Sequence, residues 1–355
     1  MPASAGGPLT AAQLAHFRVE GYVVLAGLVD LPSIERWRDD YWALLRTAVP
    51  RLDPNDDRTW PEDKSVFPAL YGDRPTSDPR NGQRALYNFP LGSHPAVLAV
   101  VEQLGAGQLA ETTSAESSCM LVWPRPDDES VATRPPPSSS DVAADRDAEG
   151  EAGRMHPATR GVEALGTGHL DDYNNSWGWG GGFFLGITTC LTDVDRDGGG
   201  FTLFPRSHRA FHRYFRRHPE RVDGSYNDHL LRGTPRGGFQ HIFDAAMSDP
   251  VDPVRVGSPL QFCGRAGDTI LWHGWLAHDG SPNLRRNQPR LAAITRWHHV
   301  GVQREDDRVI APHFGREGRQ GQVRYRVPEE LFERWSAECR SSGGVPVPVL
   351  ARPAL

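Results

Sequence analysis

The sequence has few cysteines, no long apolar run and no excess of basic residues, and each absence excludes a class of protein. No apolar stretch approaches the roughly 18 residues of a membrane span. With 39 basic against 45 acidic residues, the formal net charge is −6, which favours neither nucleic acid nor an anionic membrane as a partner. The four cysteines form no C-x-x-C pair, so they predict reduced buried thiols and not a zinc knuckle or disulfide framework. They are Cys119, Cys190, Cys263 and Cys339.

The start of the chain also lacks a targeting signal. Its first residues, MPASAGGPLTAAQLAHF, contain no basic segment followed by an apolar core, which is the pattern of a secretory signal peptide. We therefore expect a cytoplasmic protein. The length of 355 residues is compatible with one large domain with insertions, and we expect a single domain over 1–355 with an oligomeric state that the sequence leaves open.

Glycine and proline are abundant, with 37 and 30 residues, which favours a β-rich fold with many turns. The N-terminal part, 8–110, is nevertheless predicted to be mainly helical. Helices are expected over 10–20 with Thr10 as cap, over 31–47 with an apolar face, and over 93–105 with Ser93 as cap. The segments YVVLAG and SCMLVWP predict strands, and 50–82 predicts a long loop.

The composition changes between about 125 and 160. This segment is rich in proline, serine and acidic residues and nearly free of large apolar side chains. It cannot bury enough surface to offset its ordering entropy. We therefore expect a disordered insertion inside the domain.

Strand patterns dominate the second half of the chain. The segments 181–194 and 201–205, separated by DRDGGG, predict a hairpin or a close relative, and Ser207 is expected to cap a following helix. PLQFCG, GDTILWHGW and RLAAITRWHHVG predict three more strands, and a helix over 328–339 lies in a C-terminal part, 326–355, that ends in a loose tail. The order predicts a β-sandwich or jelly roll over about 115–305, with helices packed on one face.

The short segment GHLDDY, residues 168–173, contains His169 and Asp171. Side chains two residues apart share one face of a β-strand, so this pair can bind one metal ion. A third ligand must come from far downstream, and His278 in GDTILWHGWLAHDGSPN is the candidate. Two neutral imidazoles and one carboxylate suit Fe(II) and its oxygen chemistry. The H-E-x-x-H motif that many zinc hydrolases carry is absent from the sequence.

Arg290 lies twelve residues after His278, at the start of the expected strand RLAAITRW. An arginine there can bind a carboxylate through two parallel hydrogen bonds. A 2-oxo acid that binds iron through its keto end needs such a partner for its far carboxylate. The pattern H-x-D, then His, then Arg therefore predicts a 2-oxoglutarate-dependent oxygenase.

Other residues compete for these roles. Strand alternation directs Asp172 away from the face of Asp171, and His273 follows its strand directly and is expected to pack in the core. The remaining histidines are expected at strand ends, on the surface or in structural positions: His208, His298 and His299. The rival arginines lie in a loop or further along the same strand: Arg285, Arg286 and Arg296.

These residues carry a resemblance to the phytanoyl-CoA dioxygenase family of Fe(II)/2-oxoglutarate-dependent oxygenases. The matching segments, in order, are HFRVEGYVVLAGLVD, GHLDDY, LTDVDRDGGGFTLFPRSHR and GDTILWHGWLAHDGSPNLRRNQPRLAAITRW. The match covers about 10–30 and 165–300. It implies a double-stranded β-helix, or jelly roll, in agreement with the strand pattern.

The resemblance also assigns roles. It implies iron ligands at His169, Asp171 and His278, and a co-substrate arginine at Arg290. The sequence departs from the family pattern at Arg206, where PRSH replaces a segment similar to PGSH, and at Gly280, where relatives often carry serine. Ser281 is a candidate to replace that serine in co-substrate binding.

The implied reaction is hydroxylation of a small-molecule metabolite, with 2-oxoglutarate and O2 consumed and succinate and CO2 released. An aspartate at position 171 disfavours chlorination, whereas desaturation, epoxidation or ring formation stay open, as does use of a CoA thioester. A metal-binding cupin that acts as an isomerase, epimerase or binding protein is the alternative, and a catalytically inactive homologue is another. Arg290 argues against the first, and the intact triad argues against the second.

Overall fold

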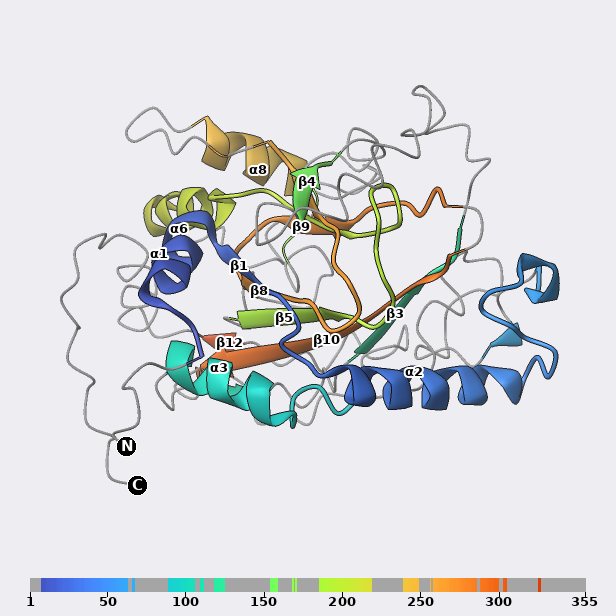
Figure 1. Ribbon diagram of the computed structural model, residues 1–355. Coiled ribbons are helices and arrows are strands. Elements are labelled where there is room, and N and C mark those ends of the chain that lie inside the picture. Colours follow the sequence, from blue (N-terminus) through green and yellow to red (C-terminus); the bar gives the residue numbers. More distant parts are fainter. Residues whose placement is uncertain are drawn as a thin grey trace, which may run out of the picture.

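The fold is described from a computed structural model (Figure 1). The structure describes residues 8–62, 66–67, 89–105, 109–111, 118–124, 154–158, 168, 170, 185–218, 239–248, 256, 258–285, 288–299, 303–304 and 325–326. The predicted helix over 328–339 and most of the predicted insertion lie outside these residues.

The larger of two main sheets has six antiparallel strands in the order β1-β8-β5-β10-β2, with β3 also paired to β10. Its members are β1 (Tyr22–Leu25), β2 (Leu109–Glu111), β3 (Ser118–Val122), β5 (Leu185–Cys190), β8 (Thr269–His273) and β10 (Arg290–His299). Strands from the two ends of the described chain thus lie side by side (Figure 1).

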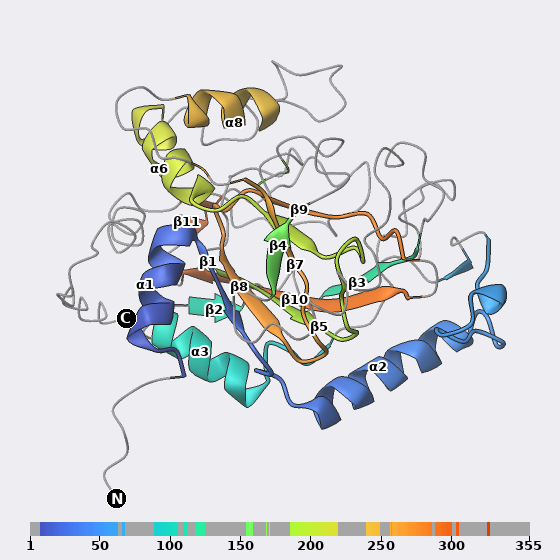
Figure 2. The ribbon, with the colours of Figure 1, turned by 45° about the horizontal axis from the view of Figure 1, so that its top comes forward.

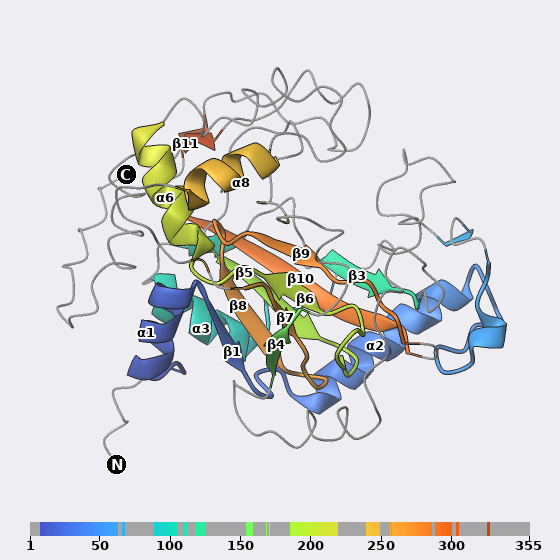
Figure 3. The same cartoon turned by 90° about the horizontal axis from the view of Figure 1, so that it is seen from above.

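The smaller sheet has four antiparallel strands in the order β4-β7-β6-β9. They are β4 (Met155–Pro157), β6 (Phe201–Leu203), β7 (Leu260–Phe262) and β9 (His278–Gly280). Figure 3 shows these strands stacked over the larger sheet. A separate two-stranded ladder pairs β11 (Gln303–Arg304) with β12 (Tyr325–Arg326).

Apolar side chains from both main sheets meet in one buried cluster, which we call the inter-sheet core. The larger sheet contributes Val24, Ile270 and Ile294, among others, and the smaller sheet contributes Phe201 and Phe262. Two antiparallel sheets packed on a shared core, with strands distant in sequence as neighbours, form a jelly roll. The fold predicted from the strand pattern is therefore confirmed.

Helices cover the other face of the larger sheet (Figure 1). Because side chains alternate along a strand, Val23 and Leu271 point away from the inter-sheet core and join a second cluster with residues of three helices. These helices are α1 (Ala11–Glu20), α2 (Leu31–Arg46) and α3 (Pro95–Gly105). A 3-10 turn, η1 (Asp57–Thr59), follows α2.

Local signals define the first two helices as predicted. Thr10 caps α1, its side chain accepting from the Gln13 backbone N–H, and Gly21 ends the helix in the left-handed conformation with φ of 87°. Asp30 caps α2 by accepting from the Ser33 N–H at 2.9 Å. This hydrogen bond is the first cause that lowers the pKa of Asp30 to about 2.

Two further helices, α6 (Ser207–Arg217) and α8 (Phe239–Met247), lie together at one end of the sheets (Figure 2). Phe211 of α6 and Phe243 of α8 have ring centroids 6.0 Å apart. Their cluster, which we call the helix-end cluster, also includes Leu170, Trp275 and Ala277. The sequence analysis did not predict α8. This helix of nine residues follows a polar sequence that is rich in turn-forming residue types.

Several predicted details are wrong. The segments 181–194 and 201–205 do not form a hairpin, because β5 belongs to the larger sheet and β6 to the smaller. The predicted disordered insertion extended to about 160, yet β4 pairs with β7 as part of the smaller sheet. This strand's three residues gain their order from that pairing and from the hydrogen bond of the Arg154 guanidinium to Asp268 at 2.6 Å.

Two predicted caps are also wrong. Ser93 does not cap α3, because its hydroxyl donates to the Pro90 carbonyl at 3.1 Å. Ser207 does not cap α6, because its hydroxyl accepts from the Ala277 backbone N–H at 2.8 Å. The N-cap of α6 is Arg206. Both serines therefore stabilise neighbouring loops and not the helix ends.

Candidate active site

His278, the predicted distal ligand, begins β9 and is 4% exposed. Its Nδ1 lies 2.9 Å from the carbonyl oxygen of Leu276. A carbonyl oxygen can only accept, so Nδ1 carries the proton and donates it. The lone pair of the neutral ring is then on Nε2, which is the arrangement that a metal-binding histidine needs.

The His278 ring faces the inter-sheet core. Its centroid lies 4.3 Å from that of Trp272 and 5.2 Å from that of Phe201. Both aromatic residues belong to the inter-sheet core. The predicted ligand therefore lies between the two sheets, as the barrel hypothesis requires.

The predicted partners His169 and Asp171, and the rival Asp172, lie outside the described residues. Two residues of the same motif are described. Gly168 has φ of +71°, and a Cβ added to it would be 2.6 Å from the His278 carbonyl oxygen. Leu170 is fully buried in the helix-end cluster. Gly168, which immediately precedes the H-x-D motif, thus lies against the strand that carries His278.

Arg290 is the first residue of β10, opposite Val122 of β3, and is 3% exposed. Alternation along β10 places it on the same face as Ala292 and Ile294, and Ile294 belongs to the inter-sheet core. The guanidinium is close enough to influence a thiol of that core. Burial raises the pKa of Cys190 to about 12, and the charge of Arg290 opposes this rise.

Ser281 is buried, and its hydroxyl is hydrogen-bonded to the hydroxyl of Thr202. Its backbone N–H donates to the Gly200 carbonyl at 2.9 Å. The preceding Gly280 has open space where a side chain would begin, with no atom within 4 Å of an added Cβ. The co-substrate role predicted for Ser281 stays a prediction, and position 280 has room for the serine that relatives carry.

The rival histidine His273 lies in the core at the end of β8. Its Nδ1 accepts from the Trp275 backbone N–H at 3.0 Å, and its ring packs 4.9 Å from that of His208. Burial, the neighbouring His208 and His212 lower the pKa of His273 well below its ordinary value. Both His208 and His273 are therefore buried neutral histidines, and their exclusion from the ligand set stays a prediction.

The rival arginines are less suited to the co-substrate role. Arg285 donates from Nε to the Arg196 carbonyl at 2.9 Å, in the loop between β9 and β10. Arg286 lies outside the described residues, and Arg296 is half-buried further along β10, opposite Gly186. Among the described arginines of this region, Arg290 is the one that is buried on the inter-sheet face.

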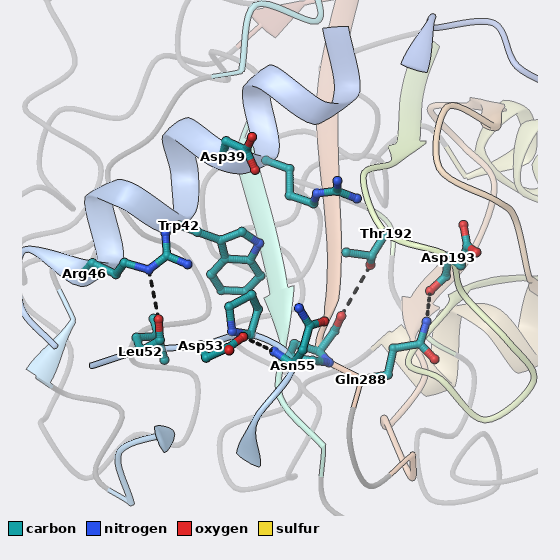
Figure 4. A pocket seen from close by; sticks show the side chains of 12 residues that line it. Asp39, Trp42, Arg46, Leu52, Asp53, Asn55, Thr192, Asp193 and Gln288 are labelled. Carbon is teal, nitrogen blue, oxygen red and sulfur yellow. Dashed lines mark hydrogen bonds between the residues drawn. The ribbon is translucent and has the colours of Figure 1, made fainter. Parts of the chain in front are cut away.

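Within the described residues, no group of three histidine, cysteine, aspartate or glutamate side chains could hold a metal ion. This result is expected, because two of the three predicted ligands are not among them. A cavity of about 620 Å³ lies elsewhere, outside the larger sheet against α2 (Figure 4). Trp42, Arg46, Asp193 and Gln288 contribute to its lining, and neither His278 nor Arg290 does. We do not assign the candidate site to it.

Sequence reasoning missed Gly186 and Trp272, which shape the surroundings of His278. A Cβ on Gly186 would be 2.2 Å from the Trp272 indole. The available signal was a glycine inside the strand LGITTC, since such a glycine often marks a close approach of another group.

Two antiparallel sheets packed as a jelly roll are the architecture of the cupin-like class. Residues 138–291 match the family model of phytanoyl-CoA dioxygenase (PhyH). The resemblance inferred from the sequence is thereby confirmed over this range, which includes His169, Asp171, His278 and Arg290.

Three of the solved structures that are similar to this chain have low sequence identity to it and low TM-scores. The non-heme alpha ketoglutarate dependent carbocyclase SnoK from nogalamycin biosynthesis is 15% identical, with TM-score 0.45 and coverage of 92% of this chain and 98% of that chain. HygX from Streptomyces hygroscopicus, with nickel and 2-oxoglutarate bound, is 17% identical, with TM-score 0.41 and coverage of 91% and 99%. EctD from S. alaskensis, with bound Fe, is 15% identical, with TM-score 0.43 and coverage of 84% and 79%.

These values are too low to carry an argument about this chain. The comparison with curated proteins found no match. In the described part of the chain, no helix is both long enough and apolar enough to cross a membrane.

Proposed function

We propose that this protein is an Fe(II)- and 2-oxoglutarate-dependent dioxygenase that hydroxylates a small-molecule metabolite and releases succinate and CO2. His169, Asp171 and His278 are the proposed iron ligands. Arg290 is the proposed partner of the 2-oxoglutarate carboxylate, and Ser281 the proposed second contact. We further propose that the protein acts in the cytoplasm, without nucleic acid or membrane as a partner.

One observation carries the proposal: the two described neighbours of the H-x-D motif, Gly168 and Leu170, have contacts that support placing the motif beside His278. Gly168 abuts the His278 backbone, and consecutive Cα atoms are about 3.8 Å apart. Leu170 points into the helix-end cluster and not the inter-sheet core. In an extended segment, residues on either side of Leu170 point the opposite way, which supports placing His169 and Asp171 toward the inter-sheet core.

The state of His278 fits a metal ligand. Its Nδ1–H donates to the Leu276 carbonyl, so the ring is held in one tautomer with Nε2 available for coordination chemistry. His169, Asp171 and His278 would hold Fe(II), because two imidazoles and one carboxylate are a ligand set that suits this ion. Bound iron with its co-substrate would supply the oxidising chemistry.

The protein's own contribution is orientation and exclusion of water. Arg290 is buried at the edge of the inter-sheet core, and an arginine can bind a carboxylate through two parallel charge-assisted hydrogen bonds. The aromatic rings of Trp272 and Phe201 line the region around His278. An apolar lining of this kind keeps bulk water from a reactive centre.

An anaerobic binding experiment tests the proposal. Fe(II) and 2-oxoglutarate added together to the full chain are expected to give a weak visible absorption band, which His278→Ala and His169→Ala abolish. His273→Ala is the matched control, because it removes a buried histidine that contacts the core and not the proposed metal. With oxygen admitted, succinate release confirms turnover, and metabolites that stimulate it identify the substrate.

The absence of the band from the unaltered protein, or its persistence in His278→Ala, would contradict the proposal. A cupin that binds metal without 2-oxoglutarate would bind Fe(II) but show neither the band nor succinate. Desaturation or ring formation would release succinate too and would be distinguished by the mass of the product.

A further inference from the structure

Trp272 is fully buried in the inter-sheet core, and its indole ring packs on the imidazole of His278 at a centroid distance of 4.3 Å and an interplanar angle of 48°. We propose that Trp272 is a positioning residue that, together with Gly186 and Thr188 of β5, sets the ring orientation of His278 for metal binding. This inference rests on the proposed function, because it concerns the same metal ligand.

The first support is the space that Gly186 leaves. Gly186 lies opposite Trp272 in the β5–β8 ladder. A Cβ there would be 2.2 Å from Cε2 and 2.3 Å from Cζ2 of the indole. The indole therefore lies flat across the glycine, in a place that any other residue would fill. This contact fixes how far the indole can lean toward β5.

The second support is a hydrogen bond that fixes the indole in its plane. The Trp272 Nε1–H donates to the Thr188 hydroxyl oxygen at 3.1 Å, and both groups are fully buried. A buried indole N–H without an acceptor is unfavourable, so the indole keeps this orientation. The indole is thus confined to one rotamer by a contact on its face and a hydrogen bond at its edge.

The imidazole is held in turn from several sides. Phe201 stacks against it with a centroid distance of 5.2 Å and an interplanar angle of 30°. The Leu276 carbonyl accepts its Nδ1 proton at 2.9 Å. The hydrogen bond sets the tautomer, and the two aromatic rings set the plane, so the direction of Nε2 is determined before any metal binds. Groups of this kind behind a ligand affect metal affinity by roughly 10–100-fold.

The experiment measures Fe(II) binding by anaerobic titration calorimetry on the full chain, without co-substrate, in Trp272→Phe and its matched control Trp297→Phe. Trp297 lies on the same sheet, is 5% exposed and faces the helix-covered side. We expect Trp272→Phe to raise the Kd for Fe(II) roughly tenfold and Trp297→Phe to leave it unchanged. A Co(II) visible spectrum, which reports ligand geometry, should change in Trp272→Phe alone.

A second pair of variants keeps the inference testable where Trp272→Phe fails to fold. Thr188→Val removes the acceptor of the indole N–H without changing the shape of the side chain. Thr189→Val is its control, because that hydroxyl pairs with Thr269 at 2.8 Å and faces away from the inter-sheet core. We expect a severalfold rise in the Kd for Fe(II) in Thr188→Val only.

The outcomes separate this inference from the proposed function. Weaker binding in Trp272→Phe and Thr188→Val than in their controls supports the positioning role. Equal binding in each variant and its control overturns that role and leaves the proposed function standing. If the unaltered protein binds no Fe(II), or His278→Ala binds it equally well, the proposed function fails and the positioning role with it.

Discussion

Gly168 and His278 are 110 positions apart in the sequence, yet their backbones touch: a Cβ on Gly168 would lie 2.6 Å from the carbonyl oxygen of His278 and 3.0 Å from its carbonyl carbon. A glycine at position 168 lets its own backbone approach β9 more closely than any other residue would. Its φ of +71° adds a second reason, because residues with side chains rarely adopt that conformation.

We therefore predict that Gly168→Ala weakens Fe(II) binding roughly tenfold or more and lowers the free energy of unfolding by about 1–3 kcal/mol. The obstructing atoms belong to the backbone, so they cannot move aside as a side chain would. Gly27→Ala is the control: Gly27 has φ of +57° but no atom within 4 Å of an added Cβ. Equal Fe(II) affinity in the two variants would refute the close-approach argument.

Arg290→Lys is predicted to raise the 2-oxoglutarate concentration required for half-maximal turnover by roughly 10–100-fold. The reason is that lysine cannot form two parallel hydrogen bonds with a carboxylate, and a charge-assisted bond contributes about 1.5–3 kcal/mol. Fe(II) affinity without co-substrate should not change. Arg285→Lys, in the loop before β10, serves as control, and an equal requirement in both variants would remove Arg290 from the co-substrate site.

Arg206 adopts the left-handed conformation, with φ of 69° and ψ of −2°, where family members usually carry glycine. Its guanidinium donates from both Nε and Nη2 to Glu20 at 2.6–2.9 Å, and its backbone N–H donates to the Glu20 carbonyl at 2.8 Å. These contacts hold Arg206 in the left-handed conformation.

Because a left-handed conformation costs about 1–2 kcal/mol for a residue with a side chain, Arg206→Ala should be less stable than Arg206→Gly by about that amount. Both variants lose the guanidinium contacts with Glu20 and keep the backbone N–H, so the comparison isolates the cost of the left-handed conformation. Urea denaturation at neutral pH measures the difference. Equal stability, or a more stable alanine variant, would show that the left-handed turn relaxes once the guanidinium is removed.

Acid should destabilise the fold through His208. Burial lowers the pKa of His208 to about 3, from an ordinary value of 6.5. Between these values the unfolded chain binds a proton that the folded protein does not, so stability falls as pH drops from 6.5 toward 3, by about 1.4 kcal/mol per pH unit. The low pKa of His273 acts in the same direction.

We predict that His208→Gln reduces the pH dependence of the free energy of unfolding by the equivalent of one bound proton. A second substitution, His273→Gln, should reduce this pH dependence further. Urea denaturation between pH 7 and pH 4.5, with a chelator present, provides the measurement. A slope identical to that of the unaltered protein would mean that His208 takes up its proton without unfolding.

Parts of the fold with strong local signals could be predicted from the sequence. Helix α1 was predicted from its cap Thr10 and from Gly21, which ends it, and helix α2 from its apolar face. Such signals act within a few residues, so they persist whatever the rest of the chain does. The pairing of β5 and β6 was mispredicted for the opposite reason, because partner strands in a jelly roll come from distant segments.

The sequence by itself determined the residue types and their order: a histidine and an aspartate two apart, a distal histidine, and an arginine twelve residues later. Only the tertiary structure decided that His278 faces the inter-sheet core while His273 packs against His208. It also decided that Trp272 lies across Gly186 and that Gly168 abuts β9. The contacts between β5 and β8 depend on strand register between segments 80 or more residues apart, and register follows from how both faces of the sheet are packed.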